Sequence, residues 1–340
     1  MQAIVTGGSG WLGKRLVKAL LEGLPDAPHA KPPAVREVTA LARTPAEMTL
    51  LAELGARPVR GDLSDPSTLT ELFVGDEERI VFHCAGLIHP ARFTREFDEV
   101  NVVGTRNLLA AAAGASRFVH VSSNSPCGVN KSPSETFDES APYDPYMAYG
   151  RTKAEGERLV RSSGLPFVIL RPPWFYGPGQ PPRQSLFFRM IRDGKAPIVG
   201  SGENRRSMAY TDDIAQACLL AATHPRAPGE TFWIADARPY TMNEIISTIE
   251  TVLERDFGIA VKHGRMKLPG FVGDVAMLVD GALQGAGLYH QKIHVLSEMN
   301  KTIACSITRA ERELGYDPKV DLEEGMRRSI RWMLDNGTKL

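Results

Sequence analysis

The sequence predicts an α/β fold in which a doubly wound parallel sheet is joined to a smaller and mostly helical region. Short β-branched and apolar runs alternate with helical patterns through the first half of the chain. Such alternation produces parallel strands connected by crossover helices. From residue 171 a segment rich in Gly and Pro, RPPWFYGPGQPP, is typical of a loop that leaves a sheet. We therefore expect a sheet domain over residues 1–171 and a substrate-binding region over 172–340, with residues 208–235 returning to the sheet domain.

The elements of the sheet domain follow from this periodicity. Strands are expected at residues 3–6, 38–42, 58–60, 80–84, 118–122 and 167–171. Helices are expected between them at residues 11–24, 45–54, 66–73, 97–113 and 149–161.

The composition excludes several classes of protein. The 340 residues include 40 Lys and Arg and 40 Asp and Glu, so the net charge is zero, and 43% of the chain is apolar. A neutral chain has no overall field to hold nucleic acid, and this apolar content is too high for a disordered protein. We expect a compact protein that binds a small-molecule substrate and no nucleic acid.

The cysteines and the first residues favour a cytoplasmic protein. The four cysteines lie far apart and without metal-ligand spacing, so neither a disulfide framework nor a metal site is expected. The chain enters a strand directly, without the basic and apolar regions of a signal peptide, and no apolar run is long enough to span a bilayer. Peripheral association with a membrane stays open.

A glycine-rich turn connects the first expected strand to the first expected helix. Gly7, Gly10 and Gly13 have the spacing G-x-x-G-x-x-G within TGGSGWLG. Glycine lets the backbone approach a pyrophosphate closely, and the positive end of the helix dipole favours its charge. In this strand–turn–helix context the motif predicts a dinucleotide-binding, Rossmann-type sheet domain.

The end of the second strand bears on which dinucleotide is bound. An acidic residue there would accept hydrogen bonds from the ribose and repel a 2′-phosphate. The sequence instead has Arg43, whose guanidinium can pair with a 2′-phosphate, so NADP is favoured over NAD. The alternative is that Arg43 lies over the adenine ring or in solvent. Asp62 and Leu63 follow the third strand and are expected to meet the adenine.

A tyrosine, a lysine and a serine form the second motif. Tyr149 and Lys153 are four residues apart at the start of an expected helix, so both project from one face. A nearby ammonium group lowers the pKa of a tyrosine and makes it a usable general acid or base. Ser122 and Ser123 leave the fifth strand at the edge where α/β sheets bind ligands, and a serine there can hydrogen-bond a reacting oxygen.

These motifs resemble those of the extended short-chain dehydrogenases/reductases, the group of sugar-nucleotide epimerases and dehydratases and of 3β-hydroxysteroid dehydrogenases. TGGSGWLG, GDLSD, HCAG, NVVGT, HVSSNS, YGRTK and LRPPWFYGPG occur in the family's order and at its separations. The resemblance implies that Ser123, Tyr149 and Lys153 are catalytic, with Ser123 preferred over Ser122 by its register to Gly128, and that Asn101 shapes the site. It also implies a homodimer formed by the helices at 97–113 and 149–161. The implied cofactor contacts are Gly7, Gly10, Trp11, Leu12, Gly13, Arg43, Asp62, Leu63, Ala85, Gly86, Tyr149, Lys153 and Pro172.

The substrate depends on residues outside these motifs. Sugar-nucleotide members of the family carry an asparagine where this sequence has Trp174, and an indole suits an apolar skeleton better than a diphosphate. Residues 264–300 include an apolar helical face that resembles the hydroxysteroid dehydrogenase-like branch. This face is expected to cap an apolar pocket, lie on a membrane surface, or pack as a core or dimer helix. Against an apolar substrate, Arg206 matches a segment in which the family uses an arginine on phosphate. The candidate substrate contacts are Asn124, Trp174, Arg206 and Tyr210.

Three functions are compatible with these residues. The favoured one is an NAD(P)-dependent oxidoreductase that transfers a hydride between nicotinamide and a hydrophobic secondary alcohol or ketone of the hydroxysteroid type. The alternative on the same fold is a nucleotide-sugar epimerase or dehydratase. A non-catalytic NADP sensor is the third, and the presence of both Tyr149 and Lys153 is an argument against it.

Overall fold

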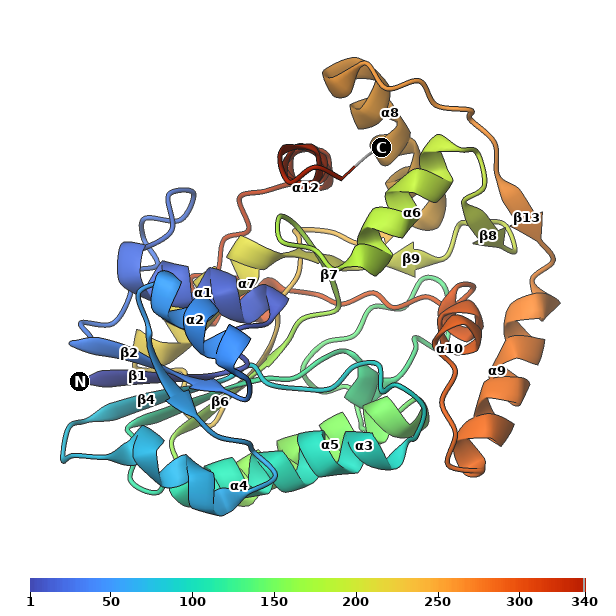
Figure 1. Cartoon of the computed structure of the whole chain (residues 1–340). Helices are drawn as coiled ribbons and strands as arrows, with labels where there is room; N and C mark the ends of the chain where they lie inside the picture. The colour runs from blue at the N-terminus through green and yellow to red at the C-terminus, as the bar shows by residue number, and fades with distance from the viewer. Residues whose placement is uncertain (339) are drawn as a thin grey trace.

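A seven-stranded sheet with helices on both faces forms the centre of the molecule in a computed structural model that describes residues 1–338 and 340 (Figure 1). The strand order is β11-β6-β5-β4-β1-β2-β3, and every neighbouring pair is parallel. The predicted doubly wound α/β fold is therefore confirmed. The strands are β1 (Gln2–Thr6), β2 (Glu37–Ala42), β3 (Arg57–Arg60), β4 (Arg79–His83), β5 (Arg117–Val121), β6 (Phe167–Arg171) and β11 (Thr231–Trp233).

The two faces of the sheet bury separate apolar clusters. Successive residues of a strand point to opposite faces. In β1, Val5 packs in the cluster that contains Leu16, whereas Ile4 packs in the cluster that contains Leu108. Because both faces are covered, all five residues of β1 are buried and its three central residues are apolar. The first face is covered by α1 (Trp11–Glu22), α2 (Pro45–Glu53) and α7 (Thr211–Thr223), and the second by α4 (Gly104–Ala111) and α5 (Met147–Ser162).

Two of the expected helices differ in type from a regular α-helix. The segment expected at 97–113 divides into α3 (Arg95–Phe97), a π-helical turn η2 (Asp98–Val103) and α4. The π-helical turn contains Asn101, whose side chain accepts a hydrogen bond from the backbone of Leu87. The segment at 66–73 is the 3₁₀ helix η1 (Pro66–Phe73). Its buried residues, Leu69 and Leu72, are three apart, which matches the 3₁₀ period.

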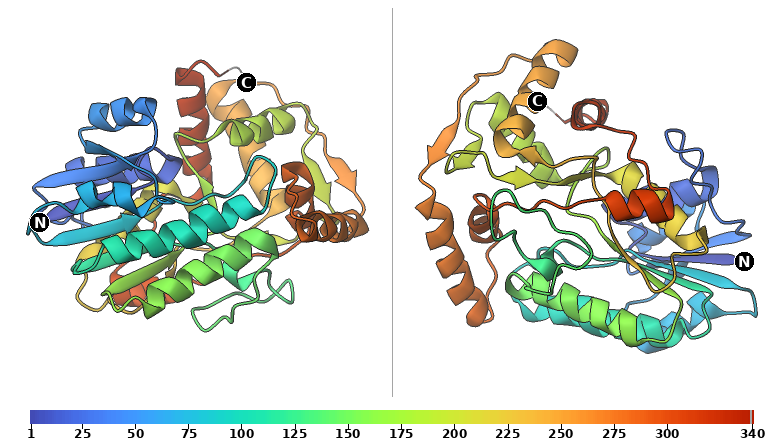
Figure 2. Two further views of the ribbon diagram at one scale, coloured as in Figure 1. Left: turned by 60° about the horizontal axis from the view of Figure 1, so that its bottom comes forward. Right: turned by 180° about the vertical axis from the view of Figure 1, so that it is seen from behind.

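The second part of the chain has an apolar core of its own. Three helices, α6 (Pro182–Arg192), α8 (Met242–Phe257) and α12 (Leu322–Asp335), pack together above the sheet in Figure 1 and remain together in both views of Figure 2. α11 (Thr308–Leu314) packs against β11. Short strands brace this region in pairs: β7 (Trp174–Tyr176) with β10 (Met208–Tyr210), β8 (Pro197–Val199) with β13 (Met266–Leu268), and β9 (Arg205–Arg206) with β12 (Tyr240–Thr241).

The segment expected to carry an apolar helical face forms α9 (Phe271–Gly285) and α10 (Gln291–Glu298). That face points to solvent: Phe271 is 65% exposed and Leu278 is 72% exposed. The buried side of the pair carries polar residues instead, including Asp280 and His294. Within the residues described, no helix has both the length and the apolar content that a membrane crossing requires.

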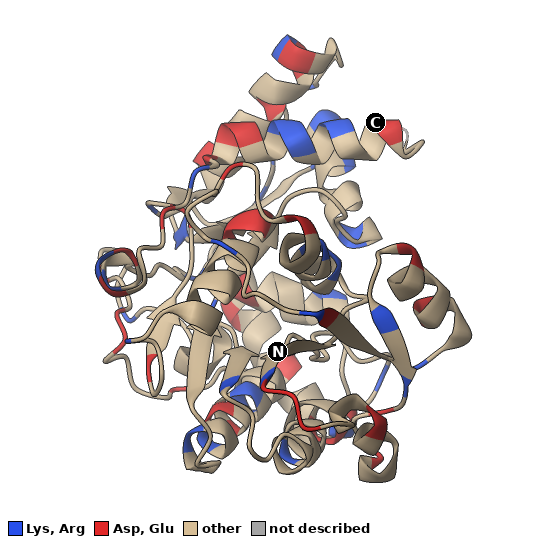
Figure 3. Ribbon diagram, turned by 90° about the vertical axis from the view of Figure 1, so that its left-hand side faces the viewer, with Lys and Arg blue, Asp and Glu red and all other residues tan. Residues whose placement is uncertain are grey.

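Charged residues of both signs are interspersed over the molecule (Figure 3). On α12, for example, Arg327 and Arg328 form ion pairs with Glu323 and Glu324 one turn away. No large field of one sign arises, in keeping with the zero net charge.

Candidate active site

The candidate residues gather at the carboxyl edge of the sheet. The glycine-rich turn follows β1, Ala85 and Gly86 follow β4, Ser123 follows β5, and Pro172 follows β6. The sheet order reverses between β1 and β4, and the crevice at such a point is the usual ligand site of a doubly wound sheet.

The glycine-rich turn forms a cradle with no room for side chains. Gly7 has a φ of +74°, and a Cβ there would lie 2.6 Å from the backbone nitrogen of Ala85. A Cβ on Gly13 would lie 1.9 Å from the carbonyl oxygen of Gly7. Gly10 is the N-cap of α1 and has no side chain to cap the helix, so the first N–H groups of α1 are free to bind an anion. This cradle fits the pyrophosphate of a dinucleotide, with Trp11 and Leu12 supplying the first backbone amides of the helix.

The expected adenosine contacts lie at the ends of β2 and β3. Arg43 is exposed, and its guanidinium is 4.0 Å from the carboxylate of Glu47. Asp62 accepts hydrogen bonds from the backbone and hydroxyl of Ser64. Partial burial raises the pKa of Asp62, but the bonds from Ser64 and the charge of Arg43 outweigh it, so the pKa is lowered. Leu63 is buried next to it.

The structure separates the two serines that follow β5. Ser122 donates to the buried carboxylate of Glu157 at 2.6 Å and is thereby held away from the crevice. Ser123 interacts with its neighbours instead: its hydroxyl lies 3.2 Å from that of Ser125 and 3.4 Å from Oδ1 of Asn124. The Ser123 hydroxyl also interacts with the Tyr149 phenol and acts to lower its pKa.

Tyr149 and Lys153 lie on the face of α5 that meets the strand ends. Burial raises the pKa of Tyr149 to about 12, with Ser123 acting in the opposite direction. Lys153 is buried, and its Nζ donates to the carbonyl oxygen of Val121 at 2.9 Å. Burial lowers the pKa of Lys153 to about 8, although Glu157 acts to raise it. A shift of both groups toward their neutral forms is typical of a desolvated site.

Asn101 ties the segment after β4 to α5. Its Oδ1 accepts from the backbone N–H of Leu87 at 2.8 Å, and its Nδ2 donates to the Leu87 carbonyl and to Thr152 Oγ1. A Cβ on Gly86 would lie 3.5 Å from Asn101 and 3.9 Å from Lys153 Nζ. Asn101 therefore shapes the floor beside Lys153.

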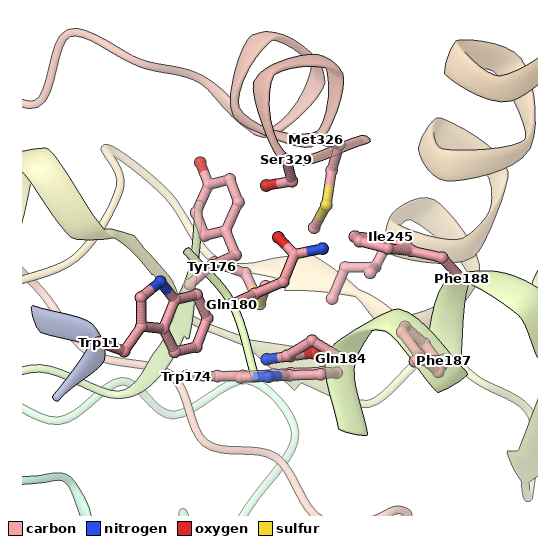
Figure 4. A pocket seen from close by; sticks show the side chains of 11 residues that line it. Trp11, Trp174, Tyr176, Gln180, Gln184, Phe187, Phe188, Ile245, Met326 and Ser329 are labelled. Carbon is pink, nitrogen blue, oxygen red and sulfur yellow. The ribbon is translucent and has the colours of Figure 1, made fainter. Parts of the chain in front are cut away.

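An aromatic group borders the crevice on the side of the second region. Trp174 lies 5.9 Å from the ring of Phe187, and the guanidinium of Arg206 lies 5.8 Å from the Trp174 ring. Figure 4 shows the adjoining pocket, in which the Trp11 and Trp174 side chains project from different elements toward the same space. Its lining consists of Trp11, Trp174, Tyr176, Gln180, Gln184, Phe187, Phe188, Met208, Ile245, Met326 and Ser329.

The other candidate substrate contacts differ in their surroundings. Arg206 is half-buried, and desolvation lowers its pKa. Its guanidinium lies 3.5 Å from the carbonyl oxygen of Lys301, and within the described residues no carboxylate lies at ion-pair distance from it. Tyr210 is 1% exposed and packs edge-on against Tyr176 in the second core, so its ring has a packing role and is not among the groups that border the crevice.

Sequence reasoning missed the charged groups that α6 and α10 bring to this crevice. Glu298 raises and Arg183 lowers the pKa of Tyr149 through their charges. His294 pairs with the buried Asp280 at 2.7 Å. These residues lie outside every motif, and the only signal for them was the interruption of the apolar pattern by Asp280.

The fold is that of an extended short-chain dehydrogenase/reductase. The model of the NAD dependent epimerase/dehydratase family matches residues 3–235, and the chain belongs to this family. An uncharacterised protein of Sinorhizobium fredii (strain NBRC 101917 / NGR234) is 50% identical over 98% of this chain and 95% of that protein. A 4-hydroxy-2-methyl-3-oxo-4-farnesyl-3,4-dihydroquinoline-1-oxide ketoreductase of Stigmatella aurantiaca is 29% identical over 96% of this chain and 95% of that protein.

A solved structure is also similar over the whole chain. The dTDP-glucose 4,6-dehydratase of Streptomyces venezuelae, with NAD and TYD bound, has a TM-score of 0.75 and 28% identity, and the match covers 99% of this chain and 98% of that one. The similar proteins thus include a reductase and a dehydratase, and the chain is an oxidoreductase-type enzyme of the epimerase/dehydratase family with a nicotinamide cofactor.

Proposed function

We propose that the protein is an NADP-dependent oxidoreductase that interconverts a hydrophobic ketone and its secondary alcohol. The observation that carries this proposal is the grouping of Ser123, Tyr149 and Lys153 beside the glycine cradle. Trp174 lines the adjoining pocket together with Trp11 of the glycine-rich turn. The three grouped residues supply proton transfer, and the Trp174 indole supplies an apolar surface for the substrate.

Each of the three residues has a distinct role. Ser123 hydrogen-bonds the reacting oxygen and Tyr149 transfers its proton. A nicotinamide cofactor held by the glycine cradle would supply the hydride chemistry. Lys153 holds a positive charge next to the site, and its lowered pKa shows how strongly burial opposes that charge. A cation in a desolvated site lowers the pKa of a nearby phenol, which opposes the burial that raises the pKa of Tyr149.

The residues at the end of β2 support NADP as the preferred cofactor. Ala42 and Arg43 stand where a carboxylate would select NAD, and Arg43 is exposed and can turn toward a 2′-phosphate. Glu47 competes for the guanidinium at 4.0 Å, so the preference is expected to be moderate.

The apolar character of the substrate is supported by Trp174 and Phe187, which lie together on the side of the second region. The ketoreductase of Stigmatella aurantiaca, whose named substrate carries a farnesyl group and a ketone, is in keeping with this proposal. The steroid-like compound favoured by the sequence remains one member of this substrate class.

A nucleotide-sugar epimerase or dehydratase is the second candidate, because Arg206 is a half-buried guanidinium without an ion-pair partner in the described residues. Elimination of water needs an additional acid and base. The residues after Ser123, which are Asn124 and Ser125, supply neither a carboxylate nor another strong acid or base. This difference argues against a dehydratase, and the apolar surface of Trp174 and Phe187 favours the ketone reductase over an epimerase.

The test is the reduction of a panel of apolar ketones with NADPH or NADH, in which the loss of absorbance of the reduced cofactor measures the rate. We expect turnover with alkyl-substituted cyclic or β-oxo ketones, faster with NADPH. The Tyr149→Phe variant should still bind NADPH and lose about 10²-fold or more in kcat, because the proton donor is gone. Full turnover by Tyr149→Phe would remove Tyr149 from the mechanism, and a nucleotide sugar that co-purifies with the protein would favour the second candidate.

A further inference from the structure

The pair of helices α9 and α10 buries polar residues against the helix that carries Tyr149. Figure 1 shows this pair beside the end of α3 and α5. Asp280 and Ser297 are fully buried and His294 is 6% exposed, whereas Leu278 on the outer side of α9 is exposed. A surface helix ordinarily has the opposite arrangement. Since buried polar groups need partners, the partners of these residues indicate what they do.

The first turn of α5 has no cap of its own. Its N-cap residue, Tyr146, makes no side-chain bond to the helix, and the first N–H groups of a helix have no partner within it. Gln284 of α9 supplies one, because its Oε1 accepts from the backbone N–H of Ala148 at 3.0 Å. A residue 136 positions away in the sequence thus caps the helix directly before Tyr149.

Gln284 is held in this orientation by a chain of hydrogen bonds. Its Nε2 donates to Oδ1 of Asp280 at 3.0 Å, and Oδ2 of Asp280 lies 2.7 Å from Nδ1 of His294. A side-chain amide has one accepting end and one donating end. Because the carboxylate of Asp280 only accepts, it directs the NH₂ group of Gln284 to itself and the carbonyl oxygen to Ala148. His294 in turn prevents Asp280 from being an uncompensated buried charge.

A second set of contacts holds the residues on either side of the cap. The hydroxyls of Tyr146 and Ser297 are 2.6 Å apart, and Ser297 donates to the His294 carbonyl. Met147, which follows Tyr146, has a φ of +54°, a left-handed conformation that is unfavourable for this residue type. Such a conformation persists only where surrounding contacts hold it, and Gly281 of α9 lies against the Met147 side chain.

We propose that Asp280, Gln284 and His294 are positioning residues that set the first turn of α5 and, through it, the Tyr149 hydroxyl relative to Ser123. The three act through the Ala148 peptide and do not touch the reacting atoms. The catalytic consequence rests on the role of Tyr149 in the proposed function. A displacement of a proton donor by about 1 Å can reduce turnover about 10²-fold.

The test exchanges the donor and acceptor of the central bond. Gln284→Glu keeps an acceptor for Ala148 but places a second carboxylate against Asp280. Asp280→Asn alone is tolerated, because an asparagine can accept from Gln284 and donate to a neutral His294. The double variant combines Gln284→Glu with Asp280→Asn. In it, the amide NH₂ at position 280 donates to the carboxylate at position 284, and the amide carbonyl at position 280 accepts from His294. The chain of hydrogen bonds is thereby restored. Leu278→Gln, on the exposed side of the same helix, is the matched control.

Two measurements are made on each variant. Hydrogen exchange of the Ala148 amide, measured by NMR, should be at least about tenfold faster in Gln284→Glu and near the native rate in the other three variants. The kcat for the ketone should fall by about tenfold or more in Gln284→Glu, with the Kd for NADPH unchanged, and should recover in the double variant. A pure packing role would not predict recovery on adding a second substitution.

The outcomes separate this proposal from the proposed function. If no ketone is reduced by the native protein, the proposed function fails, while exchange of the Ala148 amide still tests the cap. If the Ala148 amide of Gln284→Glu exchanges at the native rate, Gln284 does not cap α5. If adding Asp280→Asn to Gln284→Glu does not slow the exchange again, Asp280 does not orient residue 284. Faster exchange with unchanged kcat would overturn the positioning of Tyr149.

Discussion

At the scale of single residues, burial governs the properties of the candidate site more than any direct ion pair does. Lys153 is enclosed by the strand ends and donates to a carbonyl oxygen, so no carboxylate in the described part of the chain neutralises it at contact distance. Ser122 and Ser123 are adjacent in sequence, yet one serves the Glu157 network and the other faces Tyr149. The chemistry of each group therefore depends on which way its side chain turns.

Lys153→Met should stabilise the protein in a pH-dependent manner. The pKa of Lys153 is about 8 in the folded protein and 10.5 ordinarily, so between these values the unfolded chain binds more protons and folding stability rises with pH. Below pH 8 the variant should be more stable by roughly 3 kcal/mol, and the difference should vanish as the pH approaches 10.5. Urea denaturation at about pH 7 and about pH 10 measures this. The exposed Lys18→Met is the control, and a difference independent of pH would contradict the explanation.

Arg43→Ala should change the choice of cofactor. An exposed guanidinium that pairs with a 2′-phosphate contributes about 1.5–3 kcal/mol, so the Kd for NADPH should rise by about 10- to 100-fold. The Kd for NADH should stay within about threefold, because NADH lacks the phosphate. Fluorescence titration of both cofactors measures the ratio, with Arg36→Ala as a control on another exposed arginine. An equal loss for both cofactors would place Arg43 on the adenine instead.

At the scale of elements, one buried network fixes α5 against the sheet. Glu157 of α5 accepts two bonds from Arg171 at the end of β6, one from Ser122 after β5, and one from Tyr143. Both members of the ion pair are almost completely buried. The network sets the position of the helix along its axis, and α9 caps its first turn.

Glu157→Gln should be strongly destabilising, because it leaves the Arg171 charge buried and uncompensated. Loss of one partner of a buried ion pair costs about 3–5 kcal/mol. Chemical denaturation should show that loss, whereas Glu155→Gln, which removes an exposed pair with Arg158, should change stability by less than about 1 kcal/mol. The double variant Glu157→Leu with Arg171→Met should be more stable than Glu157→Gln. The opposite order would mean that the charges themselves are required.

At the scale of the whole molecule, α1 joins the sheet domain to the second region. Trp11, within the glycine-rich turn, donates from its indole nitrogen to the carbonyl of Pro178 at 2.8 Å and packs against Phe175. Arg15 of the same helix makes two bonds of 2.6 Å to Asp212 of α7, which covers the same face of the sheet and fixes α1 there. The Trp11 side chain therefore connects the cradle for the pyrophosphate to the loop after β7.

Trp11→Phe should weaken this connection without removing the cofactor site. Phenylalanine keeps the ring contacts but lacks the donor, so the free energy of unfolding should fall by about 1 kcal/mol. NADPH at about 100 times its Kd should still stabilise the variant by about 2.7 kcal/mol, because the backbone cradle is unchanged. Denaturation with and without NADPH measures both quantities, and Trp332→Phe in α12 is the control. Loss of the stabilisation by NADPH would mean that the indole itself contacts the cofactor.

The sequence alone determined the sheet, the order of its elements and the class of chemistry. Short apolar runs alternating with helical patterns allow few arrangements other than a parallel sheet, and all six expected strands occur within a residue or two of their expected bounds. The glycine turn and the Tyr149–Lys153 spacing are local, so a few consecutive residues suffice to reveal them. Dimerisation through the helices at 97–113 and 149–161 stays a prediction.

Only the tertiary structure decided which way α9 and α10 face and what they do. Their apolar residues predicted a pocket cap, a membrane-facing surface, or a core or dimer helix. Phe271 and Leu278 point to solvent, so they form no core stripe of this chain, and Asp280 and His294 are inside. The reason is that a hydrogen-bond partner for α5 comes from 136 positions away, at Gln284. The membrane-facing surface and the dimer helix stay predictions. The spacing of apolar residues along a sequence shows that a helix has two different faces. Only the packing of distant segments decides which face is turned toward the active site.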